Sequence, residues 1–574
     1  MKPIKVYFFA FFISLLFTVV IIKLITLQIT SREDILKHIK KQYYTKDDVI
    51  LPRGTIFDRN REILALSIPT ITVFVLPQYI RDLKRSGKVI KTAKERKIEL
   101  AQKLSPILKK PQNWILKKLN SKGYVVLAKN LGKDYQPIIE AIRRETKIWN
   151  LGIIEGSQRF YPLGKIAGNT IGYVNKYDGR GKTGIEKKFD NVLGGGIGHI
   201  LLMKDARGFP IMIIDEEKGP KKDLITTIDK NIQFIAEEVL RKVVKLRKPK
   251  EALILIVNPN TGEILANATY PNYDPNKYWK YKSHKNITFQ TPYEIGSLAK
   301  PFVVSKAIAT GKVKKDEIIF GEKGKIYVDG VRIKDHKKFG WLTVKDTIVY
   351  SSNVGVIKIA LRFKPDEFYS IFKNLGFGKS TGTFPGESKG KLREDPKPVQ
   401  IAYASIGQSW TATPIQVAMA YSAIANGGYL LKPKLALEYI DENGKTMKEK
   451  TVIIRKALTD KEIKWLKQTL KLVVEKGTAK KGKSEFYTIA GKTGTAQKYD
   501  PKIKALSMEK FYTWFAGFFP VDNPKYTVVI FLNEPKKIKK WELIGGGTVA
   551  APVLKDLVNR LMYYAKEKPD KTQK

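Results

Sequence analysis

The chain has 574 residues and no cysteine, and 43% of its residues are hydrophobic. This length allows two or more domains with buried cores, and the apolar content excludes a disordered chain. The absence of cysteine excludes disulfides, thiol nucleophiles and cysteine metal sites. The formal charge is +50, from 105 Lys and Arg against 55 Asp and Glu. Because the basic residues are spread along the whole sequence and form no nucleic-acid-binding motif, we expect an anionic membrane or polymer surface as the partner of this charge, and not nucleic acid.

The N-terminus carries an apolar run from Val6 to Leu27 whose one charged residue is Lys23. Its length matches the roughly twenty residues that a bilayer requires. Lys2 and Lys5 precede the run, so the positive-inside rule places residues 1–5 in the cytoplasm and the chain after the run outside. No small-residue cleavage site follows, which favours a retained anchor over a removed signal peptide. We therefore predict a single-pass protein of the cytoplasmic (inner) membrane, with the N-terminus inside and a transmembrane segment at 6–27.

Two regions follow this segment. Residues 28–222 combine strand-like runs with basic helical stretches, and the lysine-rich segment from Ile90 to Leu119 predicts a solvated helical region. Residues 223–565 predict a domain in which helices pack on a sheet. In it we expect strands at 224–227, 252–257, 263–268, 487–490, 513–518 and 526–532, and helices at 229–240, over most of 297–428, and at 549–564. For the charged tail at 566–574 we expect no fixed structure.

A serine and a lysine three residues apart open the helical part of the second region. Ser297-Leu298-Ala299-Lys300 precedes an apolar helical run, and Pro301 is tolerated in the first turn of a helix. Positions i and i+3 share a helix face, so the serine hydroxyl and the lysine amine can touch. A serine at a helix N-terminus also has free backbone N–H groups nearby to stabilise an oxyanion, and Gly296 leaves room for a substrate.

Two more motifs follow in order. Ser351-Ser352-Asn353 offers a hydroxyl and an amide two residues apart, for proton transfer and for binding a substrate amide. Lys492-Thr493-Gly494-Thr495 is expected at the end of a strand, where the glycine lets a peptide approach and the threonine hydroxyls can hold a carboxylate. S-x-x-K also occurs at Ser370, Ser388 and Ser507, so no motif is specific alone. The order and context of the three motifs together indicate a catalytic site.

Two phosphate-binding patterns are coincidental. The stretch Gly477–Ser484 matches a P-loop, but a helix pattern precedes it and a strand pattern follows, the reverse of what a P-loop needs. The stretch Gly179–Gly184 matches a dinucleotide motif without a surrounding βαβ pattern and is interpreted as a turn. The four histidines show no metal-ligand spacing. We therefore expect no metal and no other cofactor.

With these motifs in place, the sequence resembles the class B penicillin-binding proteins over nearly its whole length. The three motifs occur in the order seen in penicillin-binding proteins and β-lactamases, with S-S-N here for S-D-N. Further stretches resemble the non-catalytic motifs of class B, namely Arg53–Asn60, Arg159–Pro162 with Ile171–Val174, and Gly184–Lys187. Two residues depart from the family pattern: Arg61 stands where the family usually has Gly, and Ile295 where it usually has Pro.

The resemblance implies an α+β fold in three parts. These are the N-terminal transmembrane helix, an elongated pedestal of the penicillin-binding protein dimerisation type at 28–222, and a β-lactamase-like transpeptidase domain at 223–565 with helices on both sides of an antiparallel sheet. It also implies structural roles for a set of motif residues, of which Arg53 and Asp58 are expected to link the pedestal to the catalytic domain. The set is Arg53, Gly54, Asp58, Arg59, Arg159 and Glu186.

The resemblance further implies the chemistry. Ser297 would attack the penultimate D-Ala carbonyl of a peptidoglycan stem peptide and release the terminal D-Ala, and an amine from a second stem would resolve the acyl-enzyme. Lys300 is the expected base, Ser351 a proton relay, Asn353 a ligand of the substrate amide, and Lys492 a charge that tunes the site. The expected substrate-binding residues are Thr493, Gly494 and Thr495, of which the two threonines would bind the substrate carboxylate. The backbone N–H groups of Ser297 and Thr495 would form the oxyanion hole.

The assignment of Lys300 as the base also follows from the residues themselves. None of the four histidines is near the motifs in the sequence, so Lys300 is the nearest candidate. A solvated lysine has a pKa of about 10.4 and is protonated at neutral pH. We therefore expect its pKa to be lowered, by partial burial and by Lys492 as a second cation.

Within class B, several stretches resemble the division (FtsI) subgroup more than the elongation subgroup: Ile333–Asp335, Gly386–Ser388, and Gly545–Gly547 with Ala551–Val553. The resemblance thus implies septal wall synthesis, inhibition by β-lactams, and a SEDS-family glycan polymerase and other division-complex membrane proteins as partners. The alternatives are an elongation-type transpeptidase, a D,D-carboxypeptidase or β-lactamase, a β-lactam sensor, and an idle division scaffold. The pedestal and anchor argue against a free β-lactamase, the single span against a sensor, and the intact motifs against a scaffold.

Overall fold

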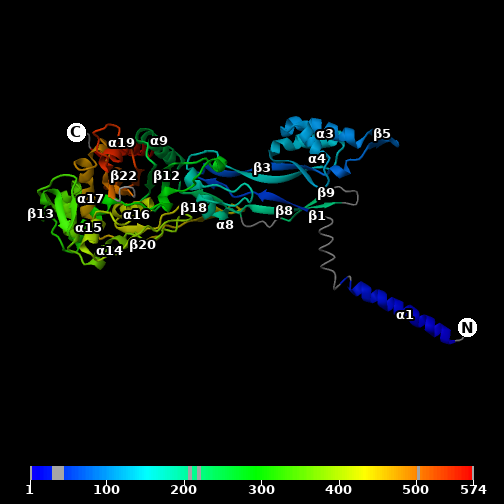
Figure 1. Ribbon diagram of the computed structural model, residues 1–574, viewed down its shortest axis with the longest axis horizontal. Helices are drawn as coiled ribbons and strands as arrows, with labels where there is room; N and C mark the ends of the chain where they lie inside the picture. Colours follow the sequence, from blue (N-terminus) through cyan, green and yellow to red (C-terminus); the bar gives the residue numbers. More distant parts are fainter. Residues whose placement is uncertain are drawn as a thin grey trace.

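The computed structural model describes residues 3–26, 28, 44–204, 210–215, 221–500 and 505–571 of the chain. The part after the N-terminal helix is elongated, with a strand-built pedestal at one end and a larger lobe containing the C-terminus at the other (Figure 1). The three-part architecture predicted from the sequence is confirmed.

The N-terminal helix α1 spans Pro3–Ile25. Its stretch from Tyr7 to Ile25 is long and apolar enough to cross a membrane, and none of it is buried against the rest of the structure. A bilayer would cover these side chains, so the helix fits a single-pass anchor. The predicted end of the span, Leu27, lies outside the described residues.

The pedestal is built on antiparallel strands. One sheet contains β1 (Tyr44–Leu51), β8 (Gly196–Lys204) and β9 (Pro210–Asp215). In the other, the long strand β3 (Ile63–Val75) pairs with both β6 (Val125–Gly132) and β7 (Leu151–Phe160). Its smaller elements are β2 (Ile56–Phe57), η2 (Pro77–Tyr79), β4 (Leu83–Arg85), β5 (Lys88–Lys91), η3 (Lys133–Tyr135), α6 (Gly168–Ile171), α7 (Gly184–Lys188) and α8 (Asp190–Leu193).

Three helices cover one end of the pedestal sheet: α3 (Ala93–Leu108), α4 (Gln112–Leu119) and α5 (Gln136–Thr146). They share a core with the strands that includes Ile71, Leu100 and Leu127. The helical character predicted for 90–119 is confirmed for most of that stretch. The stretch is not solvated on all sides, because Leu100 and Leu104 are fully buried, whereas its lysines are exposed or partly exposed.

A mixed sheet joins the pedestal to the larger lobe. Strand β10 (Asp223–Thr226) pairs in parallel with β2 of the pedestal and antiparallel with β18 (Ala436–Ile440), which in turn pairs with β19 (Thr446–Lys448). Backbone hydrogen bonds therefore run without a break from β3 through β2 and β10 into the larger lobe. The pedestal and the larger lobe therefore share one hydrogen-bonded sheet.

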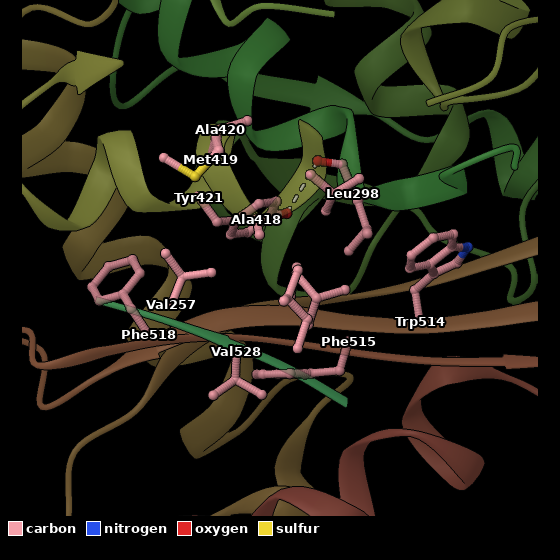
Figure 2. Close-up of a cluster of buried hydrophobic side chains, with 14 of the residues drawn as sticks. Val257, Leu298, Ala418, Met419, Ala420, Tyr421, Trp514, Phe515, Phe518 and Val528 are labelled. Atoms are coloured by element: carbon pink, nitrogen blue, oxygen red, sulfur yellow. Dashed lines mark hydrogen bonds between the residues drawn. The ribbon is translucent and has the colours of Figure 1, made fainter. Parts of the chain in front are cut away.

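The larger lobe contains a five-stranded antiparallel sheet in the order β12-β11-β23-β22-β21. Helices α9 and α19 lie on one side of this sheet and α16 on the other (Figure 1). Ala418 and Tyr421 of α16 lie on the side of the sheet to which Val257 and Phe518 point, whereas Val528 points to the other side (Figure 2). The bounds are β11 (Glu251–Val257), β12 (Ile264–Tyr270), β21 (Ala490–Asp500), β22 (Ala505–Phe519), β23 (Tyr526–Asn533), α9 (Lys230–Arg247), α16 (Pro414–Ala425) and α19 (Ala551–Tyr564).

The insertion between β12 and β21 carries most of the remaining helices. They are η4 (Pro275–Lys280), α10 (Ile287–Gln290), η5 (Gly296–Leu298), α11 (Lys300–Ala309), η6 (Glu322–Gly324), α12 (Val344–Val349), α13 (Asn353–Ala360), α14 (Pro365–Asn374), α15 (Pro398–Ser405), α17 (Asp460–Glu475) and η7 (Lys480–Gly482). Helix α18 (Gly546–Val549) precedes α19, and β17 (Tyr429–Leu431) pairs with β20 (Ile453–Lys456). The P-loop-like stretch 477–484 lies between a helix and a strand, as expected.

The prediction of helix over most of 297–428 is wrong for one segment. Two strand pairs occupy it: β13 (Ile318–Phe320) with β16 (Trp341–Thr343), and β14 (Lys325–Val328) with β15 (Val331–Lys334). The β14–β15 turn consists of Asp329 and Gly330, with φ values of 49° and 76°. An Asp-Gly pair between alternating apolar residues is a strong hairpin signal, so the sequence contained the information.

Two further expectations need correction. The K-T-G-T motif does not end a strand: β21 starts only at Ala490, and the motif occupies its first half. The tail is also held in place as far as the structure describes it, because Asp570 accepts a hydrogen bond from the Thr488 N–H at 2.7 Å and Lys571 pairs with Glu475 at 2.7 Å. Residues 572–574 of the predicted tail lie outside the described residues.

Candidate active site

Ser297 lies in the short η5 turn that leads into α11. Its neighbours Gly296 and Leu298 are buried, whereas Ser297 itself is half-buried. Gly296 has a φ of 56°, and a Cβ there would lie 2.7 Å from the backbone oxygen of Thr495. This glycine is therefore needed for the close approach of the serine turn to β21, a role that the sequence did not indicate.

A buried tyrosine stabilises the turn that contains Ser297. The Tyr421 hydroxyl of α16 donates a hydrogen bond of 3.1 Å to the Leu298 carbonyl (Figure 2). Leu298 also packs on Gly494, where a Cβ would lie 3.0 Å from the leucine Cγ and 2.7 Å from the Ile295 carbonyl oxygen. Gly494 thus lets the serine turn sit against β21. Ile295, at the position where proline is usual in the family, is buried beside it.

Lys300 points from the first turn of α11 into the S-x-N segment. Its Nζ donates to the Ser351 carbonyl at 2.8 Å, to the Ser351 Oγ at 3.3 Å and to the Asn353 Oδ1 at 2.7 Å. The residue is fully buried. Three segments that are distant in the sequence thus converge, because Lys492 of β21 also donates to the Ser351 Oγ, at 2.9 Å. Lys492 is fully buried too, and its second acceptor is the Thr493 carbonyl at 3.0 Å.

Ser351 is held in an uncommon backbone conformation. It forms the turn between α12 and α13 with a φ of 64°, which is rare for a residue with a side chain. In this conformation both its carbonyl and its hydroxyl oxygen face Lys300. Such a conformation costs on the order of 1–3 kcal/mol and persists only where the surroundings enforce it.

Asp335, which the sequence analysis did not identify as a site residue, supplies that enforcement. Its carboxylate accepts hydrogen bonds from the Ser352 hydroxyl at 2.8 Å, from the Asn353 N–H, and from the Val354 N–H at 3.3 Å. The Asn353 side chain is fixed in addition by a bond from its Nδ2 to the Lys334 carbonyl at 2.6 Å. No local pattern marks Asp335, because it lies 18 residues before Asn353 in the sequence and reaches the N-terminus of α13, where an acid is stabilising, only in the folded chain.

The two buried lysines have lowered pKa values. Burial lowers the pKa of Lys300 to about 7, against the influence of the Asp335 carboxylate, which raises it. Burial, and then repulsion by Lys300, lowers the pKa of Lys492 well below its ordinary value. The predicted lowering at Lys300 is confirmed. Its expected second cause is not found, because the repulsion between the lysines acts on Lys492.

His336 corrects the expectation that no histidine is near the motifs. It follows Asp335 directly, and its pKa is lowered to about 4 by desolvation and by repulsion from Lys300 and Lys492. The ring is therefore neutral at physiological pH, and it lies within the electrostatic reach of both lysines. No hydrogen bond joins it to them among the described residues.

The threonines of the K-T-G-T motif form a corner with two neighbouring loops. The Thr493 and Thr478 hydroxyls are 2.8 Å apart, and Thr478 is a residue that the sequence analysis missed. The Thr495 hydroxyl accepts a hydrogen bond of 2.9 Å from the Gly546 N–H. Hydroxyl groups in this arrangement can hold a carboxylate.

The structural motif residues of the pedestal converge on Glu186, which is fully buried. Its carboxylate pairs with Arg53 at 3.0 Å and with Arg159 at 2.6 Å. Arg53 also pairs with Asp190 at 2.7 Å, and Arg159 donates to the Gly54 carbonyl at 2.8 Å. All partners described for Arg53 lie in the pedestal, so its expected role as a link to the catalytic domain is wrong.

Asp58 and Arg59 do make that link. The Asp58 carboxylate accepts a bond of 3.1 Å from the Lys230 N–H at the start of α9, and Arg59 pairs with Glu263 at 3.3 Å. Arg61, in the same turn, has a φ of 65°, a conformation that glycine adopts more easily. The departure from the family pattern therefore leaves a locally strained residue that the turn tolerates.

Comparisons with known proteins agree with this arrangement. Residues 252–559 match the penicillin binding protein transpeptidase domain, and residues 48–226 match the penicillin-binding protein dimerisation domain. The chain is 31% identical over 576 residues to the peptidoglycan D,D-transpeptidase FtsI of Buchnera aphidicola, covering 97% of this chain and 94% of the relative. It is 30% identical over 517 residues to a protein of Neisseria meningitidis named "Probable peptidoglycan D,D-transpeptidase PenA", covering 88% of this chain and 83% of the relative.

A solved structure shows the same fold. Penicillin binding protein 2X from Streptococcus thermophilus superposes with a TM-score of 0.77 at 24% identity, covering 91% of this chain and 81% of that one. The pedestal, the sheet with helices on both sides and the order of the three motifs thus occur together here as they do in one family. The chain belongs to the penicillin-binding protein transpeptidase family and is a class B peptidoglycan D,D-transpeptidase.

Proposed function

We propose that Ser297 is the acylated nucleophile and Lys300 its base. The observation that carries this proposal is the Ser351 hydroxyl, which lies between the two buried lysines at 3.3 Å from Lys300 Nζ and 2.9 Å from Lys492 Nζ. A lysine with a pKa near 7 is neutral in a large fraction of molecules at physiological pH and can accept a proton. A serine hydroxyl needs such a base to become a nucleophile.

In the proposed acylation step, the Ser297 Oγ forms a bond to the penultimate D-Ala carbonyl carbon while its proton passes to the Lys300 amine. The peptide C–N bond then breaks, and the proton reaches the nitrogen of the departing D-Ala through Lys300 and Ser351. Deacylation runs in the same way, with the amine of a second stem peptide attacking the ester and returning a proton to Ser297.

Substrate binding is proposed for the corner next to the nucleophile. Thr493 and Thr495 would hold the terminal carboxylate, and Gly494 brings their strand against the serine turn. Asn353 would bind a substrate amide after exchanging one of its present partners, Lys300 or the Lys334 carbonyl. The backbone N–H groups of Ser297 and Thr495 would stabilise the oxyanion.

Penicillin labelling tests these roles. We expect one acyl adduct, on the peptide that contains Ser297, and none in the Ser297→Ala variant. Variants of the decoy serines at 370, 388 and 507 should label like the wild type. An adduct that persists in Ser297→Ala would refute the assignment, and product analysis with stem-peptide substrates separates cross-linking from hydrolysis by a D,D-carboxypeptidase.

For the membrane, we propose a retained N-terminal anchor with the N-terminus in the cytoplasm and the catalytic domain outside. The exposed apolar helix α1 and the lysines at positions 2 and 5 support it. Protease added to intact spheroplasts should digest the chain beyond about residue 30. Protection of the catalytic domain would contradict this topology.

For the cellular role, we propose septal wall synthesis with a SEDS-family glycan polymerase. The support is the division-like stretches, one of which contains Asp335, together with a relative named FtsI that is matched over 94% of its length. Depletion of the protein in its own organism should give filaments that fail to divide. Cells that become round and wide instead would indicate the elongation-type alternative.

A further inference from the structure

The loop between β23 and α18, residues 534–545, presents large apolar side chains to solvent beside the proposed carboxylate corner. Trp541 is 78% exposed and Leu543 is 82% exposed. Between them, Glu542 turns inward, and the loop ends at Gly545 and Gly546, next to the Thr495 hydroxyl. We call residues 536–543 the lip.

The lip is anchored and not merely loose. Arg247, at the end of α9, holds the Glu542 carboxylate with two bonds of 2.6 and 2.8 Å. The same carboxylate accepts from the Ile538 N–H at 2.9 Å, and the Arg247 carbonyl accepts from the Lys536 N–H at 2.7 Å. The Arg247 and Glu542 side chains are 8% and 16% exposed, respectively, so this ion pair is largely buried. The fold therefore fixes the loop in a shape that keeps Trp541 and Leu543 outside.

The charges of the lip indicate what it would bind. It contains four exposed lysines, and among the described residues none of them pairs with a carboxylate. Lys539 lies over the Trp541 ring at 5.2 Å. An exposed aromatic ring beside unpaired cations fits a ligand that carries both flat apolar faces and carboxylates. The four lysines are Lys536, Lys537, Lys539 and Lys540.

We propose that the lip is a docking site for the uncross-linked peptidoglycan strand beyond its D-Ala-D-Ala end, with a sugar ring against Trp541 and stem-peptide carboxylates on the lysines. The inference rests on the proposed function, because it places the strand next to the corner formed by Thr495. A stem peptide whose terminal carboxylate reaches Thr493 and Thr495 has the rest of its chain within reach of the loop that ends at Gly545. The lip thus selects polymer over small peptides, whereas penicillin needs only the site at Ser297.

The test uses the full chain in detergent with pentapeptide-bearing glycan strands as the probe. Binding is measured in the Ser297→Ala background, so that no chemistry occurs, and penicillin acylation is measured with Ser297 present. We expect Trp541→Ala to weaken strand binding about tenfold, the effect of an aromatic anchor at an interface. Acylation by penicillin should stay as in the parent chain. Replacing the four lip lysines by Gln should weaken binding and reduce its salt dependence.

Matched controls come from the pedestal. Trp149 is also exposed, at 49%, and Trp149→Ala should leave strand binding unchanged. Loss of the same amount of charge elsewhere should also have little effect, tested by Gln at the exposed positions Lys84, Lys88, Lys109 and Lys122.

Several outcomes would overturn the proposal. Normal strand binding by Trp541→Ala refutes the lip while leaving the nucleophile intact, and a missing adduct at Ser297 refutes the proposed function instead. Equal losses in the lip and pedestal variants would mean that the strand binds through overall charge. A Trp541→Ala variant that loses affinity for anionic vesicles but not for glycan strands would make the lip a membrane contact.

Discussion

Arg53 in the pedestal and Lys300 in the catalytic lobe are both buried cations, yet their surroundings differ. Arg53 has two carboxylate partners, Glu186 at 3.0 Å and Asp190 at 2.7 Å. Among the described residues, the direct hydrogen-bond partners of Lys300 are all neutral and lie on Ser351 and Asn353. The carboxylate that acts on its pKa, Asp335, is already occupied by Ser352, Asn353 and Val354.

The difference separates support from reactivity. An arginine cannot lose its proton in a protein, so its burial requires paired charge, and the pedestal supplies it. A lysine can lose its proton, and burial without a directly bound carboxylate favours its neutral form. The free-energy cost of burying a charge is therefore met by paired carboxylates in the pedestal, where it holds the fold together. In the catalytic lobe the same cost favours a neutral lysine that can act as a base. Four predictions follow from this contrast, in order of decreasing effect.

The largest effect is expected for Lys300→Arg. Arginine keeps the charge but cannot give up a proton, so the base is lost. Acylation by penicillin should slow by about 10²–10⁴-fold, the usual contribution of a positioned base. Stopped-flow acylation with a circular dichroism check of folding measures it. A variant within about tenfold of the wild-type rate would show that another group is the base.

Glu186→Gln should destabilise the pedestal. It leaves Arg53 and Arg159 buried beside a neutral amide, and breaking a buried ion pair costs about 3–5 kcal/mol. Thermal unfolding should shift to lower temperature, while penicillin acylation of the folded protein stays normal. The control is Glu485→Gln, which removes the exposed pair with Lys555 and should change nothing measurable. An unfolding temperature like that of the control would contradict the view that this network supports the fold.

Lys300→Met should change the stability of the protein in the opposite direction and make it more stable. Replacing a buried charge that lacks a direct counter-charge by an apolar side chain should stabilise the protein by about 1–4 kcal/mol, although acylation is lost. The folded pKa of Lys300, about 7, lies below its ordinary value of 10.5. Above the ordinary pKa the lysine is neutral in both the folded and the unfolded protein, so its burial as a charge costs no stability. As the pH falls from the ordinary pKa toward 7, the unfolded state binds the proton first, and the folded wild type becomes less stable relative to it. The stability gain of Lys300→Met over the wild type should therefore grow as the pH falls toward 7. A loss of stability in this variant at neutral pH would contradict the proposed difference between Arg53 and Lys300.

The sequence predicted the parts of this structure that depend on local patterns. The apolar run of α1, the strand pattern around 252–257 and the three catalytic motifs were recognisable because each depends on neighbours in the chain. The contacts that gave Gly296 and Gly494 their roles could not be predicted. Each of these glycines admits a backbone from a segment about two hundred residues away in the chain, and no local pattern records such an approach.

The errors have two physical origins. The hairpin at Asp329 and Gly330 was locally encoded and was overlooked within a region dominated by helices. The order of the C-terminal residues and the role of Asp335 are tertiary effects. Asp570 is fixed only because Thr488 lies beside it, and Asp335 acts only because β15 brings it to the start of α13. Charge composition alone suggested a free tail and gave no sign of a carboxylate that holds the S-x-N turn.

The smallest predicted effect concerns Asp335 and the pH dependence of acylation. Below its pKa Lys300 is charged and cannot accept the Ser297 proton, so acylation of the wild type should rise with pH through about 7 and then level off. The Asp335 carboxylate favours the charged form of Lys300 and raises its pKa, so Asp335→Asn should move the rising limb to lower pH. The substitution replaces one of the two acceptor oxygens at the start of α13 by an NH2 group and should also lower the plateau. A purely structural role would lower the plateau without moving the midpoint. Asp346→Asn is the matched control, because Asp346 lies in the first turn of α12 next to its cap Thr343 and no interaction joins it to Lys300. A midpoint that stays in place in Asp335→Asn, or moves to higher pH, would show that this carboxylate does not set the charge of the base.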